Sequence, residues 1–350
     1  MLYQISNPHG GDVYGREISL DFSANTNPYG TPPGVIKAIA DVLPDLRQYP
    51  DPYCRRLIAA LSQHEALPPE YILCGNGAAE LIYAYCEAAR PKVALELAPT
   101  FSEYSLGLKR VGCRVERYFL KEENDFLPDD GLLKAIEQVK PQAVFLCSPN
   151  NPTGQVMPQP LLKAALQLCQ DINCRLFLDE CFLDLAEQGQ SLKGRLASYP
   201  GLCILKAFTK SYGMAGVRLG YCLSSDTALL KKMSESVQPW NVSLPAQAAG
   251  VAALREQAFL NKARQTIFAE RPKMAAGLKG LGLKVYPSCA NYLLFHGRPG
   301  LSDALLAHKI AIRSCANYYG LGEGWYRTAV RLPDENRQLL AALTKVLQHT

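Results

Sequence analysis

From residue 71 to residue 223, short apolar runs alternate with longer amphipathic stretches. The runs are rich in Val, Leu, Ile, Ala and Cys, which is typical of strands buried on both faces of a parallel sheet. The stretches between them place apolar residues at helical spacing. We therefore expect strands at 71–74, 93–97, 115–119, 143–147, 176–178, 202–205 and 220–223. Helices are expected at 33–42, 53–65, 101–111, 129–139 and 158–171, with a further Ala-rich helix that ends at 89.

The pattern changes after residue 223. Long helices are expected over 224–278, one of them at 246–264, followed by strands at 284–286, 291–295, 310–313 and 328–331 and a last helix at 334–348. Alternating strands and helices predict an α/β fold with a mostly parallel, seven-stranded sheet, and the later segment predicts a smaller α+β domain. We expect an N-terminal arm (1–34), a large domain (35–250) and a small C-terminal domain (251–350).

Composition and charge exclude several classes of protein. The 350 residues are 48% hydrophobic and 20% charged, as in an ordinary globular protein. The net charge of +5 includes no block of Lys and Arg, so nucleic acid is not an expected partner. No apolar run approaches the roughly 18 residues of a membrane span, and no signal-peptide pattern is present, so we expect a cytoplasmic protein without a membrane partner. The 12 cysteines show no metal-ligand spacing, which predicts reduced thiols and no metal site.

Polar motifs follow three of the expected strands. Asn151 lies in S-P-N-N-P-T-G after 143–147, Asp179 ends 176–178, and Lys210 follows 202–205. In a parallel sheet the carboxyl ends of neighbouring strands form one ligand-binding edge. A lysine among apolar neighbours loses its proton readily, because desolvation disfavours the ammonium. Its neutral amine can then bond covalently to an aldehyde.

A phosphate site is expected near this lysine. The strand 71–74 leads through G-N-G-A-A-E directly into a helix, which points the backbone N–H groups of Gly77, Ala78 and Ala79 at a phosphate. Thr209 adds a hydroxyl and Arg218 adds a guanidinium fork. Because Glu80 replaces the third glycine of the dinucleotide fingerprint, the motif does not indicate a dinucleotide.

These residues together fit pyridoxal phosphate. Lys210 suits its aldehyde, Asp179 the pyridine nitrogen and Asn151 the phenolic oxygen. An aromatic side chain must stack on the ring, and Phe101 and Tyr104 begin the next helix at a neighbouring strand end. The sequence therefore predicts pyridoxal 5'-phosphate as the cofactor.

N-P-T-G at 151–154, D-E-x-F at 179–182 and T-K-x7-R at 209–218 resemble the fold type I pyridoxal-phosphate enzymes. The resemblance covers nearly the whole chain and is to the histidinol-phosphate aminotransferase-like branch. Within that branch, six stretches are most similar to members that decarboxylate O-phospho-L-threonine. They are H-G-G-D at 9–12, D-F-S-A-N-T-N-P-Y-G at 21–30, G-N-G-A-A-E at 75–80, P-T-F-S-E-Y at 99–104, and R-S-C-A-N-Y-Y-G-L at 313–321 with R-T-A-V-R at 327–331. The implied product is (R)-1-amino-2-propanol O-2-phosphate for cobalamin biosynthesis. The alternative is transamination of histidinol phosphate in histidine biosynthesis.

The resemblance also implies roles for individual residues. Lys210 is the covalent cofactor ligand, Asp179 the partner of the pyridine nitrogen and Asn151 the donor to the phenolic oxygen. Tyr49 would reach the cofactor phosphate of the other subunit, which implies a homodimer with shared active sites. Arg327 would bind the substrate carboxylate. The other residues expected around the substrate's phosphate and carboxylate are His9, Gly10, Asn25, Arg313 and Arg331, and which arginine holds which anion is left open.

Two positions depart from the usual pattern. Phe182 stands where many aminotransferases have an aromatic hydroxyl, which favours a decarboxylase. Ala207 stands where Ser or Thr often contacts the cofactor phosphate, so phosphate binding depends on Thr209, Arg218 and residues 77–79. A cofactor-binding protein without turnover is a further alternative, and the presence of the lysine, the aspartate and Arg327 argues against it.

Overall fold

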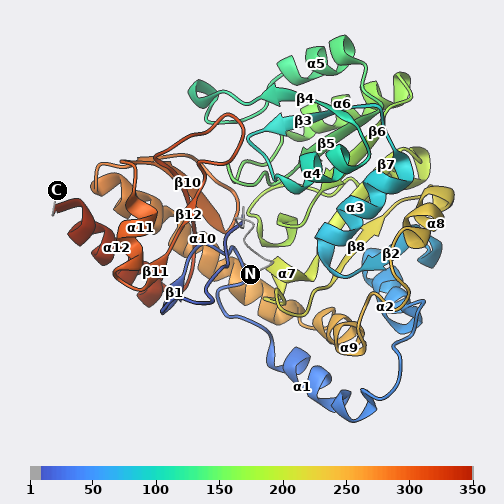
Figure 1. The fold of residues 1–350 in the computed structure, drawn as a ribbon, viewed down its shortest axis with the longest axis horizontal. Coiled ribbons are helices and arrows are strands. Elements are labelled where there is room, and N and C mark those ends of the chain that lie inside the picture. The colour runs from blue at the N-terminus through green and yellow to red at the C-terminus, as the bar shows by residue number, and fades with distance from the viewer. Residues whose placement is uncertain (1–8, 349–350) are drawn as a thin grey trace.

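The computed structural model describes residues 9–348, and its largest sheet has seven strands in the order β2-β8-β7-β6-β5-β3-β4 (Figure 1). Only β8 runs antiparallel to its neighbours. The α/β fold with a mostly parallel seven-stranded sheet is thereby confirmed. The strands are β2 (Ile72–Gly75), β3 (Val93–Ala98), β4 (Arg114–Phe119), β5 (Ala143–Cys147), β6 (Arg175–Asp179), β7 (Leu202–Ala207) and β8 (Gly220–Leu223).

Both faces of this sheet are covered by helices, which explains why its strands are apolar throughout. In β5, Val144 and Leu146 point into one core cluster, while Phe145 and Cys147 point into another on the opposite face. The first cluster packs against α1 (Pro33–Asp41), α2 (Arg55–Glu65), α5 (Gly131–Val139), α6 (Gln159–Asp171) and α9 (Leu244–Ala253). The second packs against α3 (Gly77–Ala89), α4 (Glu103–Arg110) and α8 (Thr227–Glu235).

The register of the central strands sets the position of the polar motifs. Cys147 of β5 pairs with Asp179 of β6, and Asp179 pairs with Leu205 of β7. The short helix α7 (Phe208–Ser211) follows β7 directly and carries Lys210. The three expected motifs therefore emerge at one edge of the sheet.

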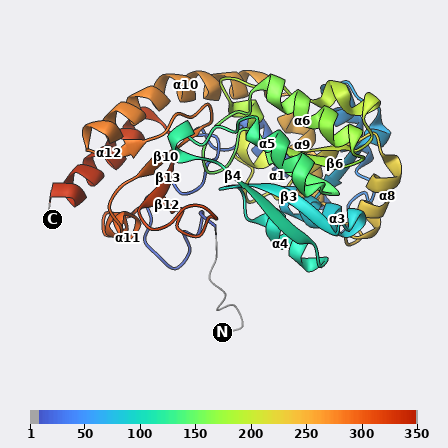
Figure 2. The same ribbon diagram turned by 90° about the horizontal axis from the view of Figure 1, so that it is seen from above.

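The C-terminal part has a sheet of its own. The long helix α10 (Gln257–Gly280) runs from the seven-stranded sheet to this part of the molecule (Figure 2). The second sheet has the order β12-β13-β10-β9 and is flanked by two further helices. These elements are β9 (Lys284–Val285), β10 (Tyr292–His296), α11 (Leu301–Leu306), β12 (Arg313–Ser314), β13 (Trp325–Ala329) and α12 (Pro333–Gln348). In residues 9–348 no helix has both the length and the apolar character needed to cross a bilayer.

The expected helix at 246–264 is wrong, because α9 ends at Ala253 and α10 starts at Gln257. Helical spacing continues through both elements and therefore does not reveal the break. The chain changes direction there, since α9 packs beside α1 while α10 contacts the C-terminal sheet.

The N-terminal arm joins the C-terminal part to the lysine turn. Strand β1 (Leu20–Asp21) pairs in parallel with β11 (Ile310–Ala311). Further along, the Asn27 backbone N–H donates to the Lys210 carbonyl at 2.9 Å, and the Asn27 side-chain amide donates to the Ser211 carbonyl at 2.8 Å. A Cβ on Gly213 would lie 2.4 Å from the Gly30 carbonyl oxygen, so glycine permits this close approach.

Candidate active site

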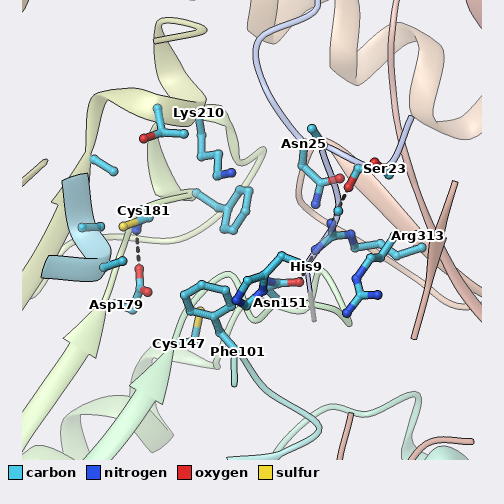
Figure 3. Close-up of a pocket in the computed structure, with 18 of the residues that line it drawn as sticks. His9, Ser23, Asn25, Phe101, Cys147, Asn151, Asp179, Cys181, Lys210 and Arg313 are labelled. Carbon is cyan, nitrogen blue, oxygen red and sulfur yellow. Dashed lines mark hydrogen bonds between the residues drawn. The ribbon is translucent and has the colours of Figure 1, made fainter. Parts of the chain in front are cut away.

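A cavity of about 210 Å³ lies between the carboxyl edge of the seven-stranded sheet, the N-terminal arm and the C-terminal part. Figure 3 shows Lys210 and Asp179 on the sheet side, with Asn25 and Arg313 across from them. Seven parts of the chain that are remote in sequence thus contribute to one site, namely 9–25, 78–79, 101–104, 147–151, 179–182, 207–218 and 313–327. The sequence-predicted residues that line it are His9, Gly10, Asn25, Ala78, Ala79, Phe101, Tyr104, Asn151, Asp179, Thr209, Lys210, Arg218, Arg313 and Arg327.

The amine of Lys210 points into this cavity. Burial, together with the positive charges of Arg327 and Arg218, lowers the pKa of Lys210 to about 8. Its Nζ lies 5.5 Å from the ring centroid of Phe182. At pH 7 roughly a tenth of the amine is then neutral and able to act as a nucleophile, far more than for an ordinary lysine.

Asp179 is held by two hydrogen-bond donors. The Tyr104 hydroxyl donates to Oδ2 at 2.6 Å, and the Cys181 backbone N–H donates to Oδ1 at 2.8 Å. Burial raises the pKa of Asp179, while these donors oppose the shift by stabilising the carboxylate. Because Tyr104 is fully buried and engaged with Asp179, Phe101 is the one of the two predicted aromatic residues that is available to stack on a ring.

The phosphate site is built from the start of α3. The preceding residue, Asn76, makes no side-chain cap, so the first N–H groups of the helix are available to an anion. Ala78 and Ala79 line the cavity, whereas Gly77 does not. Gly77 has φ +80°, and a Cβ there would lie 2.6 Å from Nη2 of Arg218. Glycine thus lets the guanidinium pack against the turn.

Arg327 is buried and held on three sides. Its Nη2 donates to the Ser23 carbonyl at 2.8 Å, and its Nη1 donates to Oδ1 of Asn151. The Asn25 amide, with its oxygen facing Arg327, accepts from Nε at 3.0 Å. Tyr318 also donates to Oδ1 of Asn151, at 3.3 Å. Since that oxygen is occupied, the Asn151 amide nitrogen is the group suited to donate to a cofactor oxygen.

Arg313 and His9 line the side of the cavity away from the sheet. Nη2 of Arg313 donates to Oδ1 of Asn317 at 2.7 Å, and its guanidinium carbon lies 5.5 Å from the centroid of the Tyr318 ring. Nε2 of His9 lies 2.6 Å from Oε1 of Glu103. The cavity is therefore strongly cationic, with Asp179 as the one acidic residue among the described residues that line it.

The structure does not bring Arg331 or Tyr49 into the cavity. Arg331 forms an ion pair with Glu335 at 2.7 Å and donates to the Asp21 carbonyl at 3.0 Å. Tyr49 is 78% exposed and stacks on Trp240 with ring centroids 4.6 Å apart. Arg331 thus stabilises the N-terminal arm, and Tyr49 is accessible to another chain.

Sequence reasoning missed Tyr318, Ser23 and Cys181 as lining residues. Tyr318 lies in the same motif as Arg313, and Cys181 lies between Asp179 and Phe182, so their positions within motifs were the available signal. Ser23 contributes through its backbone carbonyl, which side-chain chemistry does not reveal.

Residues 17–343 match the family model described as aminotransferase class I and II. The chain is 37% identical to the threonine-phosphate decarboxylase of Salmonella typhimurium, over 97% of this chain and 96% of that protein. It is 35% identical to the histidinol-phosphate aminotransferase of Roseiflexus castenholzii, over 95% and 90% of the two chains. The crystal structure of histidinol-phosphate aminotransferase from Sinorhizobium meliloti in complex with pyridoxal 5'-phosphate superposes with a TM-score of 0.85 at 25% identity, covering 96% and 92%.

Proposed function

Because this chain belongs to the class I and II aminotransferase family of pyridoxal-phosphate enzymes, we propose that it binds this cofactor and decarboxylates O-phospho-L-threonine. The product would be (R)-1-amino-2-propanol O-2-phosphate, a building block of the cobalamin nucleotide loop. The similarity to the Salmonella decarboxylase supports this choice within the family.

The residues of the cavity fit the cofactor. The N–H groups at the start of α3, the Thr209 hydroxyl and Arg218 would hold the phosphate, and Asp179 would hold the protonated pyridine nitrogen. Lys210 would bond to the aldehyde, and Phe101 would lie against the ring. Bound there, the cofactor would supply an electron-withdrawing ring that can take up the electron pair released at Cα.

The observation that carries the substrate proposal is the presence of Arg313, Arg327 and His9 in the same cavity as Lys210. These groups come in addition to those that suit the cofactor phosphate. A planar guanidinium fork binds carboxylate or phosphate with two parallel hydrogen bonds. A substrate with a carboxylate at one end and a phosphate at the other therefore matches the charge of the site.

This chain's residues would direct the reaction by orientation. Arg327 is fixed by Asn25, Asn151 and Ser23, so it can hold one substrate anion in a set direction. Arg313 and His9 would hold the other. The substrate amine would replace Lys210 at the aldehyde, which frees Nζ. Once the bond from Cα to the carboxylate breaks and CO2 leaves, the freed and protonated Nζ of Lys210 would deliver a proton to Cα.

We also propose a homodimer with shared sites. The exposed Tyr49–Trp240 pair lies outside this chain's own cavity, and Arg218 is exposed at the cavity's edge. A second copy packed on this surface would cover both and bring its Tyr49 to the phosphate end of the site.

The test is a side-by-side assay of the purified, cofactor-loaded protein. O-phospho-L-threonine is expected to release CO2, and unphosphorylated L-threonine serves as the matched control for the phosphate. Arg313→Gln should raise the KM for the phosphorylated substrate, whereas Lys210→Ala should abolish both CO2 release and the visible absorbance of the covalently bound cofactor. If O-phospho-L-threonine releases no CO2 while the cofactor absorbance is present, the substrate proposal fails.

The second candidate is histidinol-phosphate aminotransfer, favoured by the 35% identity to the Roseiflexus enzyme. Histidinol phosphate also carries a phosphate, and its amino group would be passed to 2-oxoglutarate. Glutamate formation from these two substrates, without CO2 release from O-phospho-L-threonine, would select this function.

A further inference from the structure

His9 is attached to a buried carboxylate behind the cavity. Its Nε2 lies 2.6 Å from Oε1 of Glu103, and the Tyr83 hydroxyl donates to the other oxygen, Oε2, at 2.6 Å. Glu103 is only 8% exposed and does not itself line the cavity. Both oxygens of one carboxylate are thus engaged, one by the N-terminal arm and one by α3.

Two further contacts limit the movement of this group. The His9 ring lies 5.5 Å from the ring of Phe101, two residues before Glu103. On the far side, the guanidinium carbon of Arg110 lies 4.2 Å from the ring centroid of Tyr83. Arm, α3 and α4 therefore meet around Glu103, and the bond to His9 is the largest cause of the lowered pKa of Glu103.

The adjacent residues Glu103 and Tyr104 contact opposite sides of the site. Tyr104 donates to Asp179, on the side expected to hold the cofactor, while Glu103 holds His9 at the side expected to hold the substrate. The first turn of α4 thus connects the arm to Asp179 at the end of β6. A surface arm without such an anchor would have to be ordered by the substrate at an entropic cost.

We propose that Glu103, held by Tyr83, is a positioning residue that fixes His9 and the N-terminal arm at the cavity so that the imidazole meets an anionic group of the substrate. This rests on the proposed function in so far as it assigns the anion to a phosphorylated amino acid. A carboxylate is required because it offers two acceptor oxygens. Glutamine offers one acceptor oxygen and, at the other position, an NH2 group that only donates, so Glu103→Gln cannot accept from both His9 and Tyr83.

The kinetic test uses Glu103→Gln, His9→Ala and the double variant, with Glu87→Gln on the exposed surface of α3 as the matched control. Glu103→Gln should raise the KM for O-phospho-L-threonine about 5- to 10-fold, the size expected for one lost hydrogen bond, with kcat nearly unchanged. In the His9→Ala background it should have no further effect, because it acts through His9. Additive effects of the two substitutions, or a fall in kcat with KM unchanged, would overturn the proposal.

The binding test needs no turnover and therefore separates this inference from the assigned reaction. Calorimetric titration of the cofactor-loaded protein with inorganic phosphate should show similarly weakened binding in Glu103→Gln and His9→Ala, with Glu87→Gln as wild type. The same pattern in a protein that fails to decarboxylate O-phospho-L-threonine would refute the reaction and leave the positioning role standing. If wild type does not bind phosphate, or if Glu103→Gln lowers the melting temperature while phosphate affinity is unchanged, Glu103 has no positioning role.

Discussion

Lys206 is buried and Lys210 is half-buried, yet their removal should change stability in opposite directions. Lys210 has a pKa lowered to about 8, mainly by burial. Lys206 has a raised pKa, because Asp184, Glu65 and Glu180 outweigh the effect of burial. In the cofactor-free protein we expect Lys210→Met to stabilise the fold and Lys206→Met to destabilise it.

The expected gain in the free energy of unfolding of Lys210→Met follows from the lowered pKa of Lys210. A fall from the ordinary value of 10.5 to about 8 corresponds to roughly 3 kcal/mol at about 1.4 kcal/mol per pH unit. Since the folded pKa lies below the unfolded one, the cost is present in full below pH 8. It disappears as the pH rises toward 10.5, so the advantage of Lys210→Met should shrink over that interval.

The expected loss of stability in Lys206→Met follows from the ion pair between Lys206 and Glu65. Its Nζ lies 3.1 Å from Oε1 of Glu65, whose pKa is lowered to about 2 although the carboxylate is buried. Lys193 and Tyr221 also bind Glu65, at 2.8 and 2.6 Å. Removing Lys206 leaves buried carboxylate charge only partly compensated, which costs about 3 kcal/mol.

The assay is urea unfolding of the cofactor-free proteins at several values between pH 7 and pH 10.5, followed by circular dichroism. Because the gain of burying a methionine does not depend on pH, the change of the stability difference between pH 7 and pH 10.5 isolates the electrostatic effect of Lys210. The reasoning would be refuted by a Lys210→Met variant that is less stable than wild type at pH 7. A stability difference between wild type and Lys210→Met that does not change between pH 7 and pH 10.5 would refute it equally.

Three other substitutions test the site. Tyr104→Phe removes a hydrogen-bond donor that lowers the pKa of Asp179, so the pKa of Asp179 should rise. The acid limb of the pH profile of kcat should then move to higher pH, and kcat should fall about tenfold. An acid limb that does not move would show that Tyr104 does not set the pKa of Asp179. Gly213→Ala places a Cβ 2.4 Å from the arm and should destabilise the fold by more than about 1 kcal/mol in urea unfolding, whereas an unchanged midpoint would mean the arm does not lie there. Mixing inactive Tyr49→Ala and Lys210→Ala subunits should restore about a quarter of wild-type activity if sites are shared between two chains, and no recovery would count against sharing.

The large sheet could be predicted because its strands obey a local rule. All seven expected strands are present, with Ala143–Cys147 and Gly220–Leu223 at the expected bounds. Buried strands must be apolar on both faces, and this requirement can be recognised from the residues of each short segment alone. The order of the strands around Asp179 then follows from the alternation of strands and helices.

The C-terminal part was harder to predict for a physical reason. The single expected strand at 310–313 is two strands in different sheets, since β11 pairs with β1 and β12 pairs with β13. One residue, Ile312, separates them. The pattern of apolar residues does not show that the chain changes from one partner strand to another at this point. This change nevertheless brings Arg313 to the cavity.

The arrangement around Glu103 lay beyond sequence reasoning because it depends on pairs 94 and 20 residues apart. Its consequence concerns selectivity among phosphorylated substrates. The sheet side of the cavity supplies groups suited to the cofactor, while the arm and the C-terminal part supply His9, Asn25, Arg313 and Arg327. Because the arm is held by β11, by the lysine turn and by Glu103, the anion-binding groups sit at a set distance from Lys210. A substrate is then selected by whether its two ends span that distance, which is why changes in the arm's anchors should alter KM before they alter kcat.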